Sequence, residues 1–243
     1  MDRKPVKAKS YANIAIIKYW GKEDAKQMVP STSSISLTLE NMYTETSLSP
    51  LPANATAHEF YIDGEFQNPA EQAKIGAVID GLKPANEAGF VRVDTSNNMP
   101  TAAGLSSSSS GLSALVKACN QYYDLGLSQE ELAQKAKFAS GSSSRSFFGP
   151  LAAWDKESGE IYKVQTDLKL AMIMLVLNDK QKPVSSREGM KRCMKTSTNF
   201  KEWIEESRQD YKDMLGYLAA NDFEQVGQLT ERNALAMHAT TRT

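Results

Sequence analysis

A run of small and hydroxyl-bearing residues at positions 100–111 has the chemistry of a phosphate-binding loop. It reads Pro-Thr-Ala-Ala-Gly-Leu-Ser-Ser-Ser-Ser-Ser-Gly and lies between a predicted strand at 90–94 and an apolar helical pattern that begins at Leu105. Small residues let the backbone approach a ligand closely, and the free N–H groups of a helix's first turn favour an anion. The run lacks the Gly-Lys-Ser/Thr of a Walker loop, and a flexible serine linker is the alternative. Because the run abuts a helix, we favour phosphate binding.

Three other segments place basic side chains beside hydroxyl groups. Residues 139–146, Ala-Ser-Gly-Ser-Ser-Ser-Arg-Ser, contain Arg145, whose guanidinium can hold a carboxylate or phosphate with two hydrogen bonds. Lys18 sits in an otherwise apolar predicted strand, where an unpaired ammonium is costly, so an anionic partner is expected. Residues 180–190 put serines and basic groups at the start of a helix. For each segment the alternative is an ordinary solvated loop, helix cap or strand-end lysine.

The overall charge limits what these anion sites can serve. The chain has 243 residues with 28 basic and 29 acidic side chains, so its net charge of −1 gives no attraction to nucleic acid or to an anionic membrane. Any anionic ligand must therefore be held by a local cluster of positive groups. Several such sites in one nearly neutral chain predict an ATP-dependent enzyme that acts on a small anionic substrate.

The remaining chemistry-bearing residues do not indicate a hydrolase or a zinc protein. His58 and His238 are the only histidines, and no Gly-x-Ser-x-Gly motif accompanies them. Cys119 and Cys193 lack metal-ligand spacing and are interpreted as free thiols in a reducing compartment. The N-terminus leads into no apolar signal segment, and the longest apolar run, 170–177, is too short to span a bilayer. We therefore expect a cytoplasmic protein.

The elements that must position these residues are predicted to be mainly strands over the first hundred residues. Short apolar or alternating runs indicate strands, and Asp63-Gly64 is a strong hairpin signal. The expected strands are 12–19, a half-buried 34–39, 45–49, 60–66 around that turn, and 90–94. One helix is expected near 70–82.

From about residue 105 the pattern becomes mainly helical. Residues 169–178 are apolar on both faces and predict a buried central strand, for which 151–154 and 161–164 are candidate partners. Helices are expected from Arg187 onward. The N-caps predicted by residue type are Ser128, with Glu131 completing a capping box, Asn199 and Asp222.

The motifs together resemble a known enzyme family. Residues 100–108 are similar to the phosphate loop of the superfamily of galactokinase, homoserine kinase, mevalonate kinase and phosphomevalonate kinase. Within that superfamily, Asn-Ile-Ala-Ile-Ile-Lys-Tyr-Trp-Gly-Lys at 13–22 resembles the diphosphomevalonate decarboxylases. So do Ser-Gly-Ser-Ser-Ser-Arg-Ser at 140–146, Val-Ser-Ser-Arg-Glu-Gly-Met at 184–190 and Met-His-Ala-Thr at 237–240. The resemblance runs from about residue 8 to the last residue.

The resemblance implies a fold and an activity. The fold would be α+β, with a ribosomal-S5-like, ATP-binding domain at 1–168 and a ferredoxin-like domain at 169–243 that is incomplete in this chain. The activity would be the ATP-dependent decarboxylation of 5-diphosphomevalonate to isopentenyl diphosphate, with ADP, phosphate and carbon dioxide as the other products. ATP and Mg²⁺ would be the cofactors, and the family suggests a homodimer.

The resemblance also assigns roles to individual residues. Arg145 would hold the substrate carboxylate, and Lys18 would neutralise charge near the transferred phosphoryl group, so both are predicted to be catalytic. The ATP contacts would come from Pro100, Gly104, Ser106, Ser107, Ser108 and Lys182, with Ser107 and Ser108 also at magnesium. The other substrate contacts would come from Tyr19, Lys22, Ser140 and Ser142 at the diphosphate, and from Ser186 and Arg187 at the mevalonate portion.

One expected element of the family is not found in the sequence. Family members use an aspartate in a Met-Asp-Ala-Gly-Pro-Asn segment as the catalytic base, and that segment does not occur here. A central strand at 169–178 would also need a further neighbour. We therefore expect the base and the missing strands to lie beyond residue 243, and the chain alone to bind ligands weakly without decarboxylation. The alternatives are a kinase of the same superfamily and a non-catalytic ligand-binding fragment.

Overall fold

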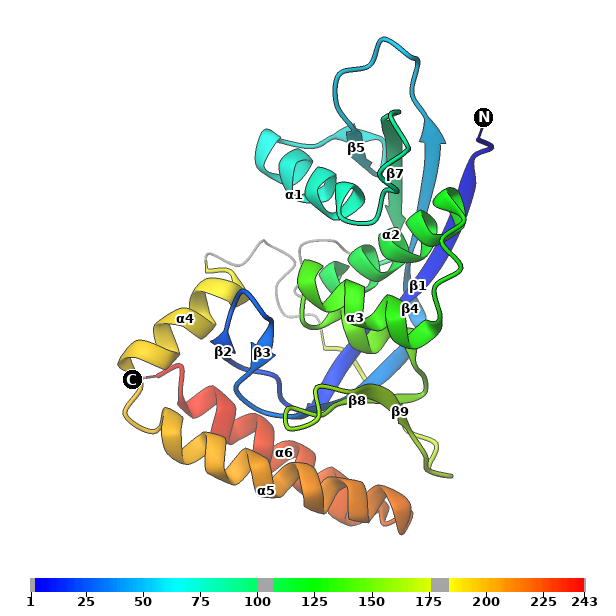
Figure 1. Ribbon diagram of the computed structural model, residues 1–243. Helices are drawn as coiled ribbons and strands as arrows, with labels where there is room; N and C mark the ends of the chain where they lie inside the picture. Colours follow the sequence, from blue (N-terminus) through cyan, green and yellow to red (C-terminus); the bar gives the residue numbers. More distant parts are fainter. Residues whose placement is uncertain (1–2, 100–106, 176–183, 243) are drawn as a thin grey trace. The chain divides into compact units, whose positions relative to one another are not determined.

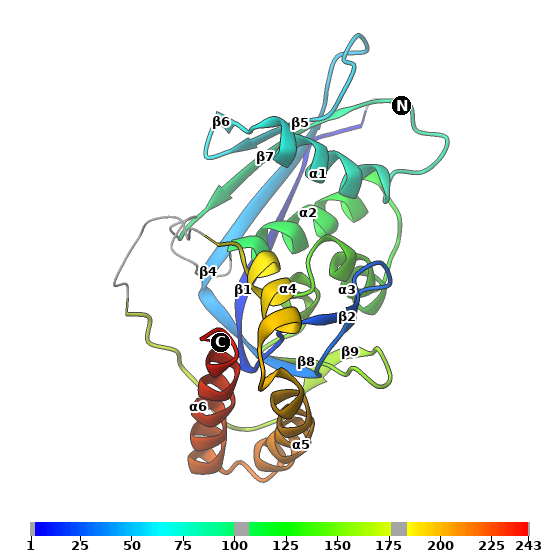
Figure 2. The ribbon, with the colours of Figure 1, turned by 90° about the vertical axis from the view of Figure 1, so that its left-hand side faces the viewer.

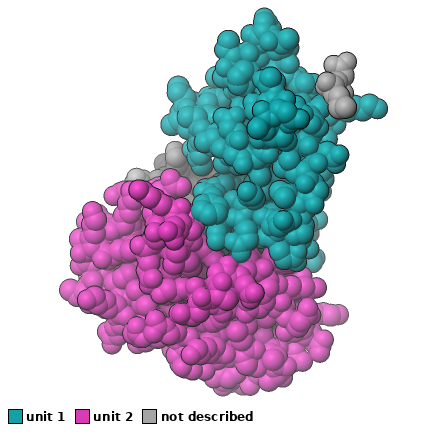
Figure 3. Space-filling view, viewed as in Figure 1, with its two compact units in different colours: residues 1–12, 39–101, 105–147 teal, residues 13–38, 102–104, 148–243 magenta. Residues whose placement is uncertain are grey.

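The computed structural model describes residues 3–99, 107–175 and 184–242 and contains both helices and strands (Figure 1). The chain forms two compact units that interleave along the sequence (Figure 3). Unit 1 comprises residues 1–12, 39–101 and 105–147, and unit 2 comprises residues 13–38, 102–104 and 148–243. The mixed α+β class expected from the sequence is confirmed, whereas the domain boundary at 168/169 stays a prediction.

In its described residues, unit 1 combines a sheet in the order β6-β5-β7-β4 with three α-helices. Its strands are β5 (Glu59–Ile62), β6 (Glu65–Phe66) and β7 (Val91–Asn97), together with parts of β1 (Val6–Ile17) and β4 (Ser34–Pro50), which continue in unit 2. Its helices are α1 (Pro69–Asp80), α2 (Ser107–Tyr123), α3 (Gln129–Ala139) and the short 3-10 helix η1 (Ser143–Phe147).

Local signals in unit 1 form the structures that they predict. Asp63 and Gly64 have φ values of 49° and 85° and join β5 to β6 in an antiparallel hairpin. The Ser128 side chain accepts a hydrogen bond from the Glu131 N–H, and the Glu131 carboxylate accepts one from the Ser128 N–H. This is the predicted capping box, and it starts α3.

The part of unit 2 that the structure describes contains the sheet order β4-β8-β9, the hairpin β2-β3 and three helices. The elements are β2 (Lys22–Asp24), β3 (Val29–Pro30), β8 (Leu151–Trp154), β9 (Ile161–Val164), α4 (Ser186–Thr196), α5 (Phe200–Ala219) and α6 (Phe223–Ala239). Residues 34–37 of β4 pair with β8 and are all buried, so this segment is not the half-buried strand that its alternation predicts. Its small serines fit into the interior.

Helices α5 and α6 lie side by side in two views (Figures 1 and 2). Asn221 adopts a left-handed conformation with φ 56°, and the Asp222 side chain accepts a hydrogen bond from the Gln225 N–H, so the chain turns and α6 begins where predicted. Asn199 precedes α5 as expected but makes no side-chain cap bond. None of the helices described is both long and apolar enough to cross a membrane.

The core of unit 2 is formed by strands and the inner faces of these two helices. The cluster includes Ile16, Ile17, Ile35, Leu37, Leu151, Met214, Leu218, Val226 and Leu229. The buried positions of α5 recur every three or four residues, as an amphipathic helix requires. Ser207 and Asp210 are polar residues among them, and both are buried.

The strand predicted at 169–178 is wrong for the part that the structure describes. Residues 169–175 are not in a strand, and Ile173 and Leu175 are 85% and 82% exposed. Residues 176–178 lie outside the described residues. The prediction depended on apolar composition, but a strand also needs a hydrogen-bonding partner. The proposed partners β8 and β9 pair instead with each other, and β8 pairs on its other side with β4.

Candidate functional site

The serine run predicted to bind phosphate leads into the first turn of α2. Ser107 is the first residue of this helix, and Ser108, the second, is exposed. Ser109 and Ser110 are fully buried, and the Ser110 Oγ lies 2.7 Å from the Thr44 Oγ1. Two serines of the run therefore face the protein interior. Ser107 and Ser108 hold the predicted position at a helix N-terminus, where an anion is favoured.

The other residues predicted to contact ATP are Pro100, Gly104, Ser106 and Lys182, and they lie outside the described residues. Their roles stay predictions. The magnesium assignment to Ser107 and Ser108 also stays a prediction, because the helix fixes only their position.

The second serine-rich segment follows α3 and is organised by its own hydroxyl groups. The Ser143 Oγ donates to the Ala136 and Ser140 carbonyls at 2.8 and 2.6 Å, and the Ser144 Oγ donates to the Gly141 carbonyl at 2.9 Å. Ser140 and Ser142, the two predicted to contact substrate, are half-buried, and their Oγ atoms lie 3.2 Å apart. The hydroxyls of this segment are thus divided between the backbone and a serine pair.

Arg145 lies in the 3-10 helix η1, whose five residues are all buried. Its side chain is among the largest fully enclosed ones in the described chain, and the residue is only 2% exposed. Helices α2 and α3 both pack against η1 within unit 1. An enclosed guanidinium keeps its charge, so this position can supply a strong, oriented donor to an anion that reaches it.

Lys18 comes directly after β1, and three contacts fix its position in unit 2. Its N–H donates to the Asn233 Oδ1 at 2.8 Å, and its carbonyl accepts from the Thr32 Oγ1 at 3.1 Å. Its Nζ donates to the Ala15 carbonyl at 2.7 Å. Burial lowers the pKa of the Lys18 ammonium. No ion pair of Lys18 with a carboxylate is found among the described residues.

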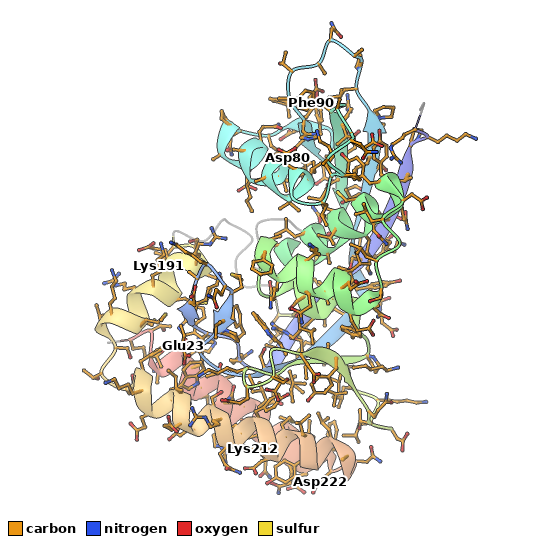
Figure 4. All side chains as sticks on the ribbon, in the orientation of Figure 1. Glu23, Asp80, Phe90, Lys191, Lys212 and Asp222 are labelled. Atoms are coloured by element: carbon orange, nitrogen blue, oxygen red, sulfur yellow. The ribbon has the colours of Figure 1, made fainter. Side chains whose placement is uncertain are left out.

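A cationic cluster, defined by Lys22, Arg187 and Lys191, forms where the β2-β3 hairpin meets α4. The Lys22 N–H lies 3.4 Å from the Met194 Sδ of α4, and its Nζ lies 3.2 Å from the Met28 Sδ. The pKa of Lys22 is lowered by burial and then by the charges of Arg187 and Lys191. Lys191 is labelled on α4 in Figure 4. Ser186 and Arg187 are the exposed first residues of α4, so hydroxyl and cationic groups are brought together here.

The residues between Lys18 and Lys22 pack against aromatic and helical neighbours. The Tyr19 ring lies 5.4 Å from the Trp154 ring, and Trp20 packs against the cluster of Cys193, Phe200, Trp203 and Met237. A Cβ placed on Gly189 of α4 would meet Trp20 at 3.3 Å. This packing holds the predicted substrate-binding segment against α4.

Gly21 is expected to be essential to that packing. It has φ 101°, and a Cβ at this position would lie 2.6 Å from the Ser31 Oγ and 2.8 Å from the Phe200 Cζ. We expect Gly21→Ala to lower the free energy of unfolding by about 2–4 kcal/mol, because backbone strain adds to overpacking. Chemical denaturation measures the loss. Gly159→Ala is the control, since Gly159 has φ 73° with open space around it. Equal losses in the two variants would contradict the role of the close contact.

The predicted residues fall into two groups that the structure describes separately. Ser107, Ser108, Ser140, Ser142 and Arg145 belong to unit 1, and Lys18, Tyr19, Lys22, Ser186 and Arg187 belong to unit 2. Sequence reasoning missed Lys191 and Asn233. Lys191 stands one helical turn after Arg187, and this spacing could have indicated it. Asn233 is 215 positions from Lys18, and no local pattern connects the two.

The chain matches two protein-family models. Residues 10–161 match the model described as the diphosphomevalonate decarboxylase-like N-terminal domain. Residues 172–243 match the mevalonate 5-diphosphate decarboxylase C-terminal domain.

Individual proteins similar to the chain include a curated relative and solved structures. This chain is 32% identical over 255 residues to diphosphomevalonate decarboxylase of Saccharomyces cerevisiae. The match covers 94% of this chain but 63% of that protein, so the chain spans less than two thirds of its length. The structure of mevalonate pyrophosphate decarboxylase from Streptococcus pyogenes is 67% identical with a TM-score of 0.94, covering 100% of this chain and 77% of that one. A structure described as MDDEF in complex with MVAPP, AMPPCP and magnesium is 35% identical with a TM-score of 0.86, covering 97% and 74%.

Proposed function

This chain belongs to the diphosphomevalonate decarboxylase family, and on that premise we propose that the protein uses ATP to decarboxylate 5-diphosphomevalonate. The products are isopentenyl diphosphate, ADP, phosphate and carbon dioxide. The observation that carries the proposal is the cationic cluster: Lys22 contacts α4, the helix that carries Arg187 and Lys191, so positive charge gathers around a predicted diphosphate contact.

The cationic cluster is a site for a strongly anionic group. Like charges held close together raise the free energy of the protein unless an anion compensates them. Within the part of the chain that the structure describes, none of the three cations forms an ion pair with a carboxylate. A diphosphate carries several negative charges and many acceptor oxygens, so it fits this cluster better than a single carboxylate does.

Lys18 and Arg145 supply the charges that the reaction requires. Lys18 places a part-buried ammonium where negative charge develops on the transferred phosphoryl group, and a low-dielectric setting strengthens that interaction. Arg145 holds the substrate carboxylate in a fixed direction until carbon dioxide is lost. Both residues stabilise and orient charge, which is the main lever available to an enzyme in phosphoryl transfer.

The start of α2 fits ATP and Mg²⁺. The first turn of α2 carries no acidic residue that would repel a phosphate, and hydroxyl oxygens are ligands that magnesium accepts. Ser107 and Ser108 are the residues that would hold the nucleotide phosphates and the metal there. Bound magnesium neutralises phosphate charge during transfer. The complex of the similar MDDEF protein with AMPPCP and magnesium supports this part of the proposal.

The protein is further proposed to be a cytoplasmic homodimer. The family resemblance suggests the dimer, and Cys119 and Cys193 are free and buried, as suits a reducing compartment. Light scattering of the purified full-length gene product measures the oligomeric state directly.

The decisive experiment supplies the full-length gene product with ATP, Mg²⁺ and 5-diphosphomevalonate labelled at the carboxyl carbon. We expect labelled carbon dioxide and ADP in equal amounts. ADP without carbon dioxide would identify a kinase of the same superfamily. Binding of the substrate without any turnover would identify a ligand-binding protein. Mevalonate and phosphomevalonate serve as control substrates, because neither carries the diphosphate that the cationic cluster is proposed to bind.

A further inference from the structure

A chain of buried polar groups in unit 2 leads from α5 and α6 to the main chain of Lys18. The Asn233 Oδ1 accepts the Lys18 N–H at 2.8 Å. The Asn233 Nδ2 donates to the Asp210 Oδ2 at 2.9 Å and to the Ser207 Oγ at 3.4 Å. Arg232 donates to the other carboxylate oxygen of Asp210. Every polar group of the Asn233 side chain is therefore used inside the protein.

These polar groups occupy positions where apolar side chains would be the simpler choice. Asn233 and Ser207 are fully buried and Asp210 is 4% exposed, although α5 and α6 pack by their apolar faces. Burying an amide and a carboxylate costs free energy unless each hydrogen bond is satisfied. A fully satisfied network of this kind specifies one arrangement of the groups that it joins.

The network fixes the position of the main chain at Lys18. Lys18 directly follows the last residue of β1, and its N–H donates a hydrogen bond to the Asn233 side chain. Thr32 holds the Lys18 carbonyl, so side chains fix both polar groups of this one residue. With the main chain held on both sides, the direction of the Lys18 side chain from its Cα is set.

We propose that Asn233, held in place by Asp210, is a positioning residue that aims the Lys18 ammonium. The proposal rests on the proposed function, in which Lys18 faces the transferred phosphoryl group. Asn233 touches neither substrate nor nucleotide in this role, and it acts only through Lys18. It also explains why the buried face of α6 carries a polar residue at this position.

The first test is a double-mutant cycle in the full-length gene product. We expect Asn233→Ala to lower kcat about tenfold to 100-fold with little change in KM, since a small misplacement of a catalytic group costs that much. In a Lys18→Met background the same substitution should have almost no further effect on kcat. Full additivity of the two effects would overturn the proposal. Thr230→Ala is the control, because it removes a hydrogen bond to the Val226 carbonyl on the same helix without touching Lys18.

The second test guards against a general loss of folding. Asn233→Asp alone puts a carboxylate beside Asp210 and should be as damaging as Asn233→Ala. Combined with Asp210→Asn, it exchanges the carboxylate and the amide between the two positions. The hydrogen bond from the Lys18 N–H and the hydrogen bond between the two exchanged side chains can then form again. We expect the double variant to recover most of the kcat lost in Asn233→Asp. No recovery in a folded double variant would contradict the proposed chain of hydrogen bonds.

The third test does not depend on activity. Hydrogen exchange followed by NMR should show the Lys18 amide exchanging at least tenfold faster in Asn233→Ala, whereas amides within α5 keep their protection. Unchanged exchange at Lys18 would overturn the inference whatever the activity. If the wild-type protein does not decarboxylate 5-diphosphomevalonate, the proposed function fails. A changed exchange rate would then still support Asn233 as the residue that holds the Lys18 main chain.

Discussion

Lys18→Met is expected to lower kcat for decarboxylation by about 10²–10³-fold, the range for losing one preorganised electrostatic contact to a transition state. Methionine keeps most of the length and apolar character of the lysine stem, so the substitution removes mainly the charge. KM for 5-diphosphomevalonate should change much less, because the interaction is proposed to strengthen only as the phosphoryl group is transferred. Steady-state kinetics with coupled detection of ADP separates the two parameters.

Two further variants decide whether the lost charge is the cause. Lys18→Arg keeps a cation at this position and should retain more activity than Lys18→Met. Lys117→Met removes another part-buried lysine, whose pKa is likewise lowered by burial, and should leave kcat within a few-fold of wild type. A wild-type kcat in Lys18→Met would show that Lys18 has no catalytic role. A comparable fall in Lys117→Met would point instead to a general effect of losing a part-buried charge.

Short-range chemistry explains the elements that sequence reasoning predicted correctly. A turn such as Asp63-Gly64 depends on which residues tolerate positive φ, and a capping box depends on a hydroxyl and a carboxylate three residues apart. These interactions are complete within four residues of chain. The hairpin and the start of α3 could therefore be read from composition and spacing alone.

The strand prediction fails at residues 169–175 because strand formation is not decided by short-range chemistry. Strand formation depends on a partner that is distant in sequence, and apolar composition says only that a partner would be favourable. Ser34–Leu37, which pairs with β8, is the opposite case, because its own pattern predicts too little burial. Its alternation predicts one solvated face, but in the structure the side chains on both faces of this segment are buried. Burial of a strand is decided by tertiary contacts that its own pattern does not contain.

The residues predicted to form the site show a similar division. Sequence reasoning identified both serine runs, but it could not say which hydroxyls turn inward. In the structure the Ser110 hydroxyl of α2 bonds to the Thr44 hydroxyl of β4, and Ser143 and Ser144 bond to nearby carbonyls. Serines of one run therefore differ in role although they are identical in type. Only the helical register and the packing of α2 and η1 separate them.

The burial of Arg145 leads to a specific prediction about its role. It is enclosed in η1, where water can scarcely screen its charge, and the planar guanidinium offers two parallel donors to a carboxylate. A lysine ammonium carries the same charge but cannot form the two-bond fork. Arg145→Lys therefore tests geometry while the charge is kept. The exchange also shortens the donor side chain inside a packed region, so folding must be checked separately.

Arg145→Lys is expected to weaken transition-state binding by about 2–4 kcal/mol, as for loss of one partner in a desolvated charged pair. That corresponds to a fall in kcat/KM of roughly 30- to 1,000-fold. Arg92→Lys is the matched control: Arg92 pairs with Asp94 at a side-chain exposure of 42%, so the same exchange there should leave kcat/KM unchanged. Thermal denaturation of both variants shows whether the enclosed site still folds. If a folded Arg145→Lys variant turns over 5-diphosphomevalonate at the wild-type rate, Arg145 does not hold the carboxylate, and the group that does must be sought elsewhere in the protein.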